Sequence, residues 1–478
     1  MGRLACFLAL WTVALLSASV TAQSTIPLVK RTNPAVVSAK LHAGPSKAIP
    51  GLHARDTVGS SALKDNGGYW LNVSIGTPPQ PVAMLVDALA TGVTVMYPGS
   101  KNANCSEYRT CAFYGQFDPR NSSSFSSNNE DWEDLPTFTT GFDHLTLGDV
   151  QTTNVSLGLI AVDDPYNSSI GVGPDNTSFP YQLVDRGLIN TPSFSAWRNP
   201  KTDHNIEQEP GDTPGGIIFG GINAAKFNGP LHSFSFRESL PLMTLPVRGI
   251  QVHVDPAANL PSTANITTTG PISSTFREAL FDLQTRYVSS YLPLEVTMTL
   301  YDALNLTTYR RDDGYYPSPE VPCSRSSENH TITFLIGSAA FDIPWSAFLT
   351  PSHIPSGGVC SFLIQPPFHE DPMFAGTLGS TLLSHLYLAV DYNSMMVGIA
   401  PLNQSPGKEE ILEIGTQAPQ FPGGVGDFPE KVTAYTPAPT ETVVTETSNG
   451  WAAMKTAGPA ARGYMLSGAA GALLLAVV

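Results

Sequence analysis

Hydrophobic and polar positions along this chain alternate in short runs and rarely recur at helical spacing. From Tyr69 to about Asn403 these runs are separated by Gly, Pro and Asn, as in YWLNVSIG, VAMLVDAL, GGIIFGGI and LYLAVDY. Alternation and short apolar runs bounded by turn residues are typical of strands. Long amphipathic stretches are scarce, so the pattern predicts an all-β body.

The beginning of the chain has a different pattern. An apolar stretch, Leu4 to Leu16, follows a basic residue and ends near the small residues Val20-Thr21-Ala22. This order is typical of a cleaved secretory signal, and the stretch is shorter than the roughly 18 residues of a membrane span. We therefore predict a signal peptide at residues 1–22. Residues 23–64 are polar and irregular, with a dibasic Lys30-Arg31 that a kexin-type protease could cut, and are predicted to be a pro-segment.

The end of the chain is rich in Pro, Thr, Glu and Gly. Such a composition cannot bury a core, so residues 404–448 are predicted to form an extended stalk. Small residues, a polar spacer and an apolar tail, Tyr464 to Val478, then follow in the order of a glycolipid (GPI) anchor signal. We predict attachment to Ser448 or Asn449, with 449–478 as the anchor signal. The alternative is a C-terminal membrane helix, for which the tail is short against about 30 Å of hydrocarbon.

Composition limits the classes of partner. The 478 residues are 42% hydrophobic and 14% charged, which fits a chain that folds around real cores. The formal net charge is −15, and Lys and Arg form no clusters, so a nucleic-acid partner is not expected. The membrane is expected as a partner only through the lipid anchor.

Cysteines and glycosylation sequons indicate the secretory pathway. Cys6 leaves with the signal peptide, and the four remaining cysteines suggest two disulfides in an oxidising compartment. Three pairings are possible; the short spacing favours Cys105 with Cys111, which leaves Cys323 with Cys360. Ten Asn-x-Ser/Thr sequons are candidate glycosylation sites. They lie at Asn72, Asn104, Asn121, Asn154, Asn167, Asn176, Asn265, Asn305, Asn329 and Asn403.

Two aspartates follow apolar runs in different halves of the body. LVD ends at Asp87 and LFD ends at Asp282. A lone Asp of this kind is commonly a solvent-facing strand end, but one in each half suggests two lobes that each present a carboxylate. Carboxylates held a few ångströms apart share a proton, so one can deprotonate a water while the other polarises a carbonyl. This is the chemistry of peptide hydrolysis without a covalent intermediate.

Longer segments carry a family resemblance. YWLNVSIGTPPQPVAMLVD, YQLVDRGLINTPSFSAW, GGIIFGGINAAKFNGPL and GSTLLSHLYLAVDYNSMMVGIAPL occur in the order found in pepsin-like aspartic proteases. The chain resembles this family, including its GPI-anchored fungal cell-surface members. The resemblance implies a bilobal all-β fold with a cleft between the lobes, an N-terminal lobe at 65–240 and a C-terminal lobe at 241–403. It also implies catalytic Asp87 and Asp282, and places the two disulfides as above.

The catalytic motifs depart from the family pattern. The family begins each motif Asp-Thr/Ser-Gly, where the Gly lets backbone amides approach the carboxylates and the hydroxyl locks the two loops together. Here the motifs are DALA from Asp87 and DLQT from Asp282, in which only Thr285 keeps a family-like hydroxyl. Two alternatives stay open: Ala90 begins an ATG that would match after an upstream insertion, and Gln284 could hold the second position. We prefer Asp87 because the GTPPQ count is unbroken, and Asp282 because it follows an apolar pair and can carry a charge.

The predicted function follows from the resemblance. We expect a pepsin-like, acid-favouring aspartic endopeptidase at the extracellular face of the plasma membrane or cell wall, acting as a monomer on peptide or protein substrates, with no cofactor and no metal. The alternative is a catalytically inactive pseudoprotease that binds peptides or wall components or has a structural role. The region expected to form the flap over the substrate contains Phe138 and Phe142 but no Tyr, and we expect these Phe side chains to pack within a hairpin.

Overall fold

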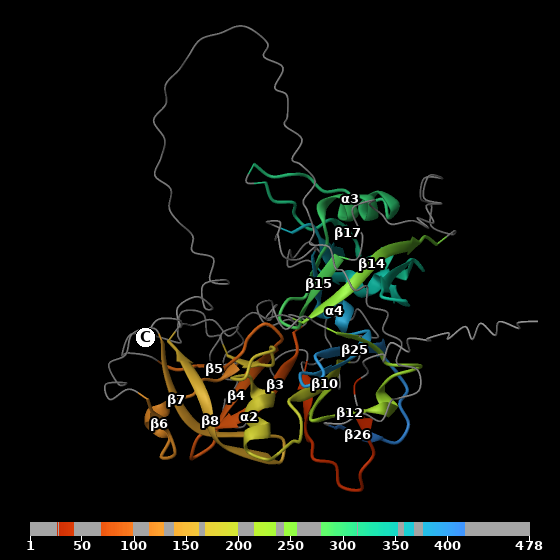
Figure 1. The fold of residues 1–478 in the computed structure, drawn as a ribbon. Coiled ribbons are helices and arrows are strands. Elements are labelled where there is room, and N and C mark those ends of the chain that lie inside the picture. The colour runs from red at the N-terminus through yellow and green to blue at the C-terminus, as the bar shows by residue number, and fades with distance from the viewer. Residues whose placement is uncertain are drawn as a thin grey trace, which may run out of the picture. The chain divides into compact units, whose positions relative to one another are not determined.

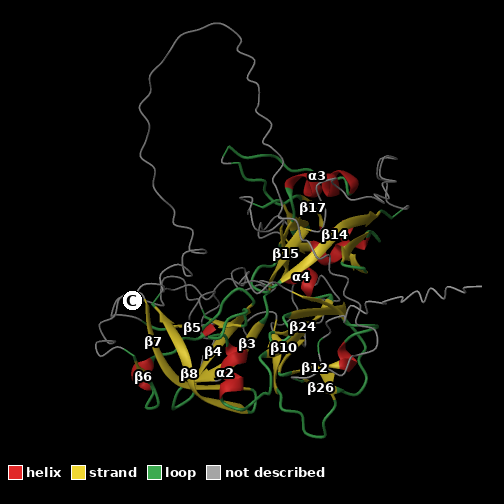
Figure 2. Cartoon of the chain, in the orientation of Figure 1, coloured by secondary structure: helices red, strands yellow, loops and turns green. Residues whose placement is uncertain are grey.

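A computed structural model describes residues 26, 28–42, 68–98, 114–128, 138–161, 168–198, 215–235, 243–255, 279–312, 314–351, 358–367 and 376–415. Within these ranges the chain is mostly β-strand with few helices, as Figure 1 and Figure 2 show. The all-β prediction is therefore confirmed. Chain contacts divide the protein into two units, Met1–Thr436 and Pro437–Val478, and every described residue belongs to the first.

The largest sheet has thirteen strands in the described residues and includes most of the N-terminal half. In sheet order they are β13 (His232–Ser235), β25 (Met396–Pro401), β24 (Leu386–Asp391), β10 (Ser193–Arg198), β11 (Gly215–Phe219), β2 (Val37–His42), β3 (Trp70–Ile75), β4 (Gln80–Asp87), β9 (Ser169–Gly171), β5 (Val93–Met96), β8 (Val150–Ile160), β7 (Phe138–Leu147) and β6 (Ser126–Ser127). The β3–β4 hairpin turns at Gly76, whose φ of +85° is a conformation that favours glycine. The second strand of this hairpin, β4, ends at Asp87.

A second sheet belongs to the C-terminal half. Its strands, in order, are β19 (Ala339–Pro344), β18 (Thr331–Ile336), β14 (Thr244–His253), β15 (Ala279–Gln284), β23 (Gly376–Gly379), β16 (Ser290–Tyr291) and β22 (Ile364–Gln365). Two small sheets are β17 (Glu320–Pro322), β21 (Val359–Phe362) and β20 (Leu349–Pro351), and β1 (Leu28–Val29), β26 (Ile411–Ile414) and β12 (Gly221–Asn223). β15 ends with the second motif, as β4 ends with the first.

The helices are short. They are α2 (Phe179–Asp185), α3 (Leu294–Ala303) and α4 (Ser380–Leu383), with 3-10 turns η1 (Pro119–Asn121), η4 (Ala224–Lys226), η6 (Cys323–Ser327) and η7 (Trp345–Phe348). α2 has Pro180 in its first turn, where no backbone N–H is needed. No helix in the described part of the chain is long and apolar enough to cross a membrane.

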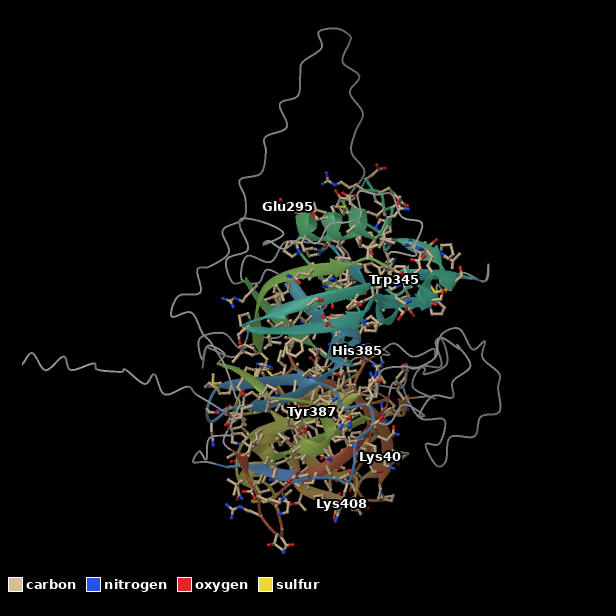
Figure 3. All side chains as sticks on the ribbon, turned by 90° about the vertical axis from the view of Figure 1, so that its right-hand side faces the viewer. Lys40, Glu295, Trp345, His385, Tyr387 and Lys408 are labelled. Atoms are coloured by element: carbon tan, nitrogen blue, oxygen red, sulfur yellow. A yellow bond between two sulfur atoms is a disulfide. The ribbon has the colours of Figure 1, made fainter. Side chains whose placement is uncertain are left out.

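Two of the three apolar clusters in the described residues contain most of the buried side chains. The larger is made of alternate residues of both big sheets, such as Leu71 and Val73 of β3. The smaller surrounds Tyr387, which Figure 3 labels and which stacks on Trp197 at 5.8 Å between ring centroids. The buried Tyr387 hydroxyl donates to Ser195 Oγ at 2.8 Å, so its polar end is satisfied.

Segments predicted to lie outside the body take part in its sheets. β2 falls within the predicted pro-segment, yet it pairs with β11 on one side and β3 on the other. β1 falls there too and pairs with β26, which lies within the predicted stalk. Period-2 burial explains β2, because Val37 and Leu41 point into the core. The ranges predicted as pro-segment and stalk therefore contain strands that pair with the rest of the described sheets.

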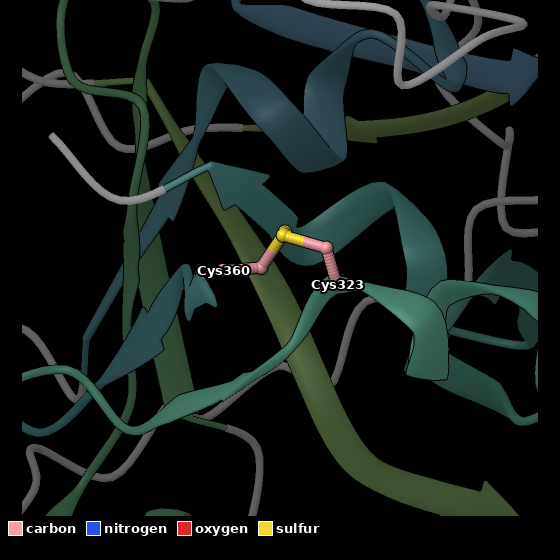
Figure 4. Close-up of a disulfide and its surroundings, with 2 residues drawn as sticks. All are labelled: Cys323 and Cys360. Atoms are coloured by element: carbon pink, nitrogen blue, oxygen red, sulfur yellow. A yellow bond between two sulfur atoms is a disulfide. The ribbon is translucent and has the colours of Figure 1, made fainter. Parts of the chain in front are cut away.

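One predicted disulfide lies within the described residues. Figure 4 shows the disulfide that joins Cys323 and Cys360. Its S–S bond is 2.02 Å long, and the two Cα atoms are 4.9 Å apart. This pairing is confirmed. Cys105 and Cys111 lie outside the described residues, as do Ser448, Asn449, the signal peptide and the anchor signal.

The predicted glycosylation sites differ in exposure. Side chains that face solvent belong to Asn121, Asn154, Asn176, Asn305 and Asn329. Asn72 is half-buried in β3, and Asn403 is half-buried with its Nδ2 donating to the Ala225 carbonyl at 2.9 Å. Asn104, Asn167 and Asn265 lie outside the described residues.

Candidate active site

Asp87 ends a buried strand and its carboxylate is held by backbone amides. The last six residues of β4 are buried, and Asp87 itself is 3% exposed. Its Oδ1 accepts hydrogen bonds from the N–H groups of Leu89 at 2.9 Å and Ala90 at 3.3 Å. A carboxylate that bonds its own backbone two residues on stabilises a turn. The carboxylate is thus oriented even though the motif has lost its Thr and Gly.

The loop after Asp87 packs directly on β9. β4 and β9 are parallel, with Asp87 paired to Gly171. A Cβ added to Gly171 would lie 2.4 Å from the carbonyl oxygen of Gly92, so only glycine fits there. Ala90, the alternative first position, lies beyond the strand, and its carbonyl accepts from Gly173 N–H at 2.8 Å. The strand register therefore supports the unbroken count to Asp87.

The second lobe repeats this arrangement at Gln284. β15 and β23 are parallel, with Gln284 paired to Gly379, where an added Cβ would lie 2.2 Å from a backbone oxygen. The residue before each position makes the same bond to a preceding segment. Leu283 N–H donates to the Met243 carbonyl at 3.0 Å, as Val86 N–H does to Tyr69 at 2.7 Å. By strand register, Gln284 is the counterpart of Asp87.

The Thr285 hydroxyl gives the same alignment independently. Thr285 is 1% exposed, and its Oγ1 donates to the Val86 carbonyl at 2.6 Å and accepts from Ala88 N–H at 3.1 Å. This hydroxyl therefore joins the two motif loops, which is the role expected of the residue directly after the catalytic position. The position before it is Gln284. The first lobe has Ala88 at the corresponding place, so only one half of the expected lock is present.

Asp282 lies two residues earlier on the same face of β15. It is buried, pairs with Thr377 of β23, and its Oδ2 accepts from Gln284 Nε2 at 2.7 Å. The expectation that Asp282 holds the second motif position differs from this register, and the alternative, Gln284, occupies it. Side chains two apart on a strand share a face, so the apolar pair before Asp282 does not distinguish it from Gln284. Whether Asp282 takes part in chemistry stays a prediction.

Arg286 places a cation beside Asp87. Its Nη1 is 3.4 Å from Asp87 Oδ2, and its side chain is 26% exposed. The guanidinium also lies 6.0 Å from the centre of the Tyr287 ring. Arg286 occupies the place of the family's motif Gly, two residues after the catalytic position. Sequence reasoning missed this residue, although counting two positions on from Gln284 would have found it.

The side chains around the loops differ in how they titrate. Tyr69, whose N–H donates to the Thr285 carbonyl at 3.4 Å, is fully buried, and burial raises its pKa. Burial likewise raises the pKa of Tyr291, with smaller contributions from two neighbouring tyrosines. Burial lowers the pKa of His385, which follows α4, to about 4, and the Arg198 charge adds to this. The tyrosines therefore stay neutral at acidic and neutral pH, while His385 titrates within the acidic range.

The hairpin expected to form the flap lies within the described residues. β7 and β8 form the hairpin that carries Phe138 and Phe142. Phe142 is half-buried, in line with packing, whereas Phe138 at the start of β7 is 54% exposed. Within the described residues, no three His, Cys, Asp or Glu side chains gather as metal ligands would.

Comparisons with known proteins agree with this geometry. The family model "Eukaryotic aspartyl protease" matches residues 68–402. "Probable aspartic-type endopeptidase opsB" of Aspergillus oryzae is 26% identical, over 74% of this chain and 72% of the relative. "Aspartic proteinase yapsin-3" of Saccharomyces cerevisiae is 24% identical over 73% and 69%, and "Secreted aspartic protease 10" of Candida albicans is 24% identical over 75% and 77%. The predicted bilobal pepsin-like fold is confirmed, and these relatives support aspartic endopeptidase as the enzyme class.

Proposed function

The chain belongs to the eukaryotic aspartyl protease family, and from this premise we propose that it is a cell-surface member that binds polypeptide without hydrolysing it. The single observation that supports this most is the Thr285 hydroxyl bridge, which aligns Gln284 with Asp87. A pair of carboxylates is then replaced by one carboxylate and one carboxamide.

The chemistry of the replaced group argues against hydrolysis. The family reaction needs one ionised carboxylate to take a proton from water and a second, protonated one to polarise the carbonyl and return the proton. The Gln284 amide neither gains nor loses a proton at acidic or neutral pH. Its Nε2–H group already donates a hydrogen bond to Asp282. Losing a positioned acid–base group costs typically 10²- to 10⁴-fold in rate. The Arg286 cation in addition balances the Asp87 charge.

A second candidate is an aspartic endopeptidase that uses Asp87 with Asp282. The observation that favours it is the buried Asp282 carboxylate, whose Oδ2 lies 2.7 Å from the Gln284 amide on the same strand face. In this candidate the Gln284 side chain would link the two carboxylates through hydrogen bonds. Two relatives, one named an aspartic-type endopeptidase and the other an aspartic proteinase, support this candidate.

Location is part of the proposal. We propose that residues 1–22 are removed as a signal peptide, that Ser448 or Asn449 receives a GPI anchor, and that 415–448 hold the glycosylated body away from the membrane. The order of apolar and polar segments supports this. The name of "Secreted aspartic protease 10" agrees with the secretory pathway. The peptide ligand and a monomeric state are parts of the same proposal.

The test compares a variant that loses the Asp87 carboxylate with a variant in which both motifs are rebuilt. Hydrolysis of a labelled unfolded protein is measured from pH 3 to 7 for wild type, Asp87→Asn and a variant that restores Asp-Thr-Gly twice. That variant carries Ala88→Thr, Leu89→Gly, Gln284→Asp and Arg286→Gly. We expect wild type to be no faster than Asp87→Asn, and the rebuilt variant to gain an activity that adding Asp87→Asn abolishes.

Binding of the same labelled polypeptide to wild type is measured by fluorescence anisotropy. Saturable binding without hydrolysis supports the proposal, and absence of binding overturns it. Hydrolysis by wild type that is lost in both Asp87→Asn and Asp282→Asn would instead establish the endopeptidase. Asp185→Asn, on the end of α2, is the matched control because it also removes one carboxylate.

A further inference from the structure

The dibasic pair near the N-terminus is held by acidic residues close to the other end of the body. Lys30 Nζ lies 2.7 Å from Glu410 Oε1, and Arg31 Nε lies 3.1 Å from Glu413 Oε2. Glu410 directly precedes β26 and Glu413 lies within it. The strand before the dibasic pair is also engaged, because Val29 of β1 pairs with Glu413.

Glu413 is the more deeply fixed of the two acids. Its side chain is 0% exposed, while the Arg31 side chain is 54% exposed. Its Oε1 accepts from Asn190 Nδ2 at 2.7 Å, and its Oε2 accepts from the backbone N–H of Ala35 at 3.1 Å. A buried carboxylate is stable only when cations and donors surround it in this way. The backbone is therefore held at Val29 before the Arg31–Thr32 bond and at Ala35 after it, in both cases by Glu413 of β26.

We propose that Glu410 and Glu413 form a latch that shields the Arg31–Thr32 bond from endoproteases specific for paired basic residues. Such a protease must bind both basic side chains in acidic pockets of its own and draw the flanking backbone into its cleft. In the folded chain the two cations face Glu410 and Glu413, Val29 is paired to β26, and the Ala35 N–H is held by the Glu413 side chain. The bond is cut rapidly only while β1 and β26 are apart.

The latch acids contribute unequally. The Lys30–Glu410 pair is solvent-exposed, with side chains 74% and 49% exposed, so it is screened and modest in strength. Its loss is expected to raise the rate of cleavage two- to five-fold, the range that exposed pairs support. The Glu413 contacts are buried, and their loss is expected to raise the rate further. Glu410 is the better test because its removal leaves the buried contacts intact.

The experiment uses the folded full chain, produced in a host without a dibasic-specific protease, and a purified protease of that class. Appearance of the Thr32 amino-terminus is followed by mass spectrometry for wild type, Glu410→Gln and Glu409→Gln. Glu409 is the matched control, because it is an exposed acid next to Glu410 and forms no ion pair with any described residue. Figure 3 labels Lys408, which precedes both in the segment that leads into β26. A synthetic peptide of residues 26–36 gives the rate for an unlatched bond.

The expected result is cleavage of wild type at least tenfold slower than the peptide, with Glu410→Gln two- to five-fold faster than Glu409→Gln. Raising the salt concentration should speed cleavage of wild type more than that of Glu410→Gln, after both are normalised to the peptide. Cleavage of wild type at the rate of the peptide overturns the proposal. So does a Glu410→Gln rate equal to that of Glu409→Gln.

Discussion

The Thr285 hydroxyl can be removed without changing the shape of its side chain, by Thr285→Val. The hydroxyl donates to the Val86 carbonyl and accepts from the Ala88 N–H, and all three residues are buried. The substitution therefore leaves the buried Val86 carbonyl and the buried Ala88 N–H without their hydrogen bonds to Thr285 Oγ1. Among the described residues the hydroxyl has no other hydrogen-bond partner, and the Thr285 carbonyl still accepts from Tyr69 N–H in the variant.

The expected cost follows from those two groups. A buried backbone donor or acceptor that loses its partner costs about 1–3 kcal/mol. Two of them sum to about 2–6 kcal/mol, and we expect about 2–4 kcal/mol because the Val86 carbonyl has a second lone pair for other donors. The variant should unfold at lower denaturant concentration with an unchanged slope.

Equilibrium unfolding in urea, followed by Trp fluorescence and circular dichroism, measures this free energy. Thr299→Val is the control, because that hydroxyl donates to the Glu295 carbonyl at 2.9 Å on the surface of α3, where the expected change is within about 0.5 kcal/mol. A Thr285→Val variant as stable as Thr299→Val would refute the bridge. The alignment of Gln284 with Asp87 would then rest on strand register alone.

Three further predictions concern other parts of the fold. The pKa of His385 is lowered by burial from 6.5 to about 4, so as pH falls between these values the unfolded chain binds a proton that the folded chain excludes. Stability should therefore fall by up to about 3 kcal/mol over this window, and His385→Gln should flatten the curve of unfolding free energy against pH; an unchanged curve contradicts this. Replacing both cysteines of Cys323–Cys360 by Ser opens a loop with a separation of 37 residues and should lower the urea-unfolding free energy by about 4 kcal/mol; a change below about 1 kcal/mol contradicts it. Glycopeptide mass spectrometry should find a glycan on the exposed Asn154 and none on Asn403, whose amide donates to a backbone carbonyl, and the reverse occupancy contradicts it.

The sequence fixes the position of the first motif more closely than that of the second, for a physical reason. Asp87 follows a strand whose start is marked by the GTPPQ turn, so counting along one hairpin was enough. β15 begins after residues outside the described part of the chain, and no turn near it fixes the count. Asp282 was then preferred for the second motif position because it can carry a charge, although Gln284 lies on the same face of β15. The Thr285 hydroxyl was the signal that could have decided between them, since the motif hydroxyl directly follows the catalytic position.

The predicted pro-segment shows a different limit. Residues 37–41, VSAKL, alternate between apolar and polar, which is a strand pattern. The pattern cannot reveal that the partner strands are β11 and β3, because pairing depends on residues distant in the sequence. The prediction of a pro-segment therefore rested on the position near the chain start and on the dibasic pair, and gave less weight to the strand pattern of residues 37–41. The same limit applies to β26, whose ILEI is too short to stand out after a polar segment.

The pairing of β1 with β26 also sets a delay during synthesis. Lys30 and Glu410 are separated by 380 residues, so the N-terminal segment emerges long before its partner strand exists. At about 5–20 residues per second, the ribosome needs roughly 20–75 s to make the intervening chain. During that interval the dibasic bond has no latch, and afterwards it does. The fate of the N-terminal segment is therefore decided by whether a processing protease acts before or after the last strand of the body is made.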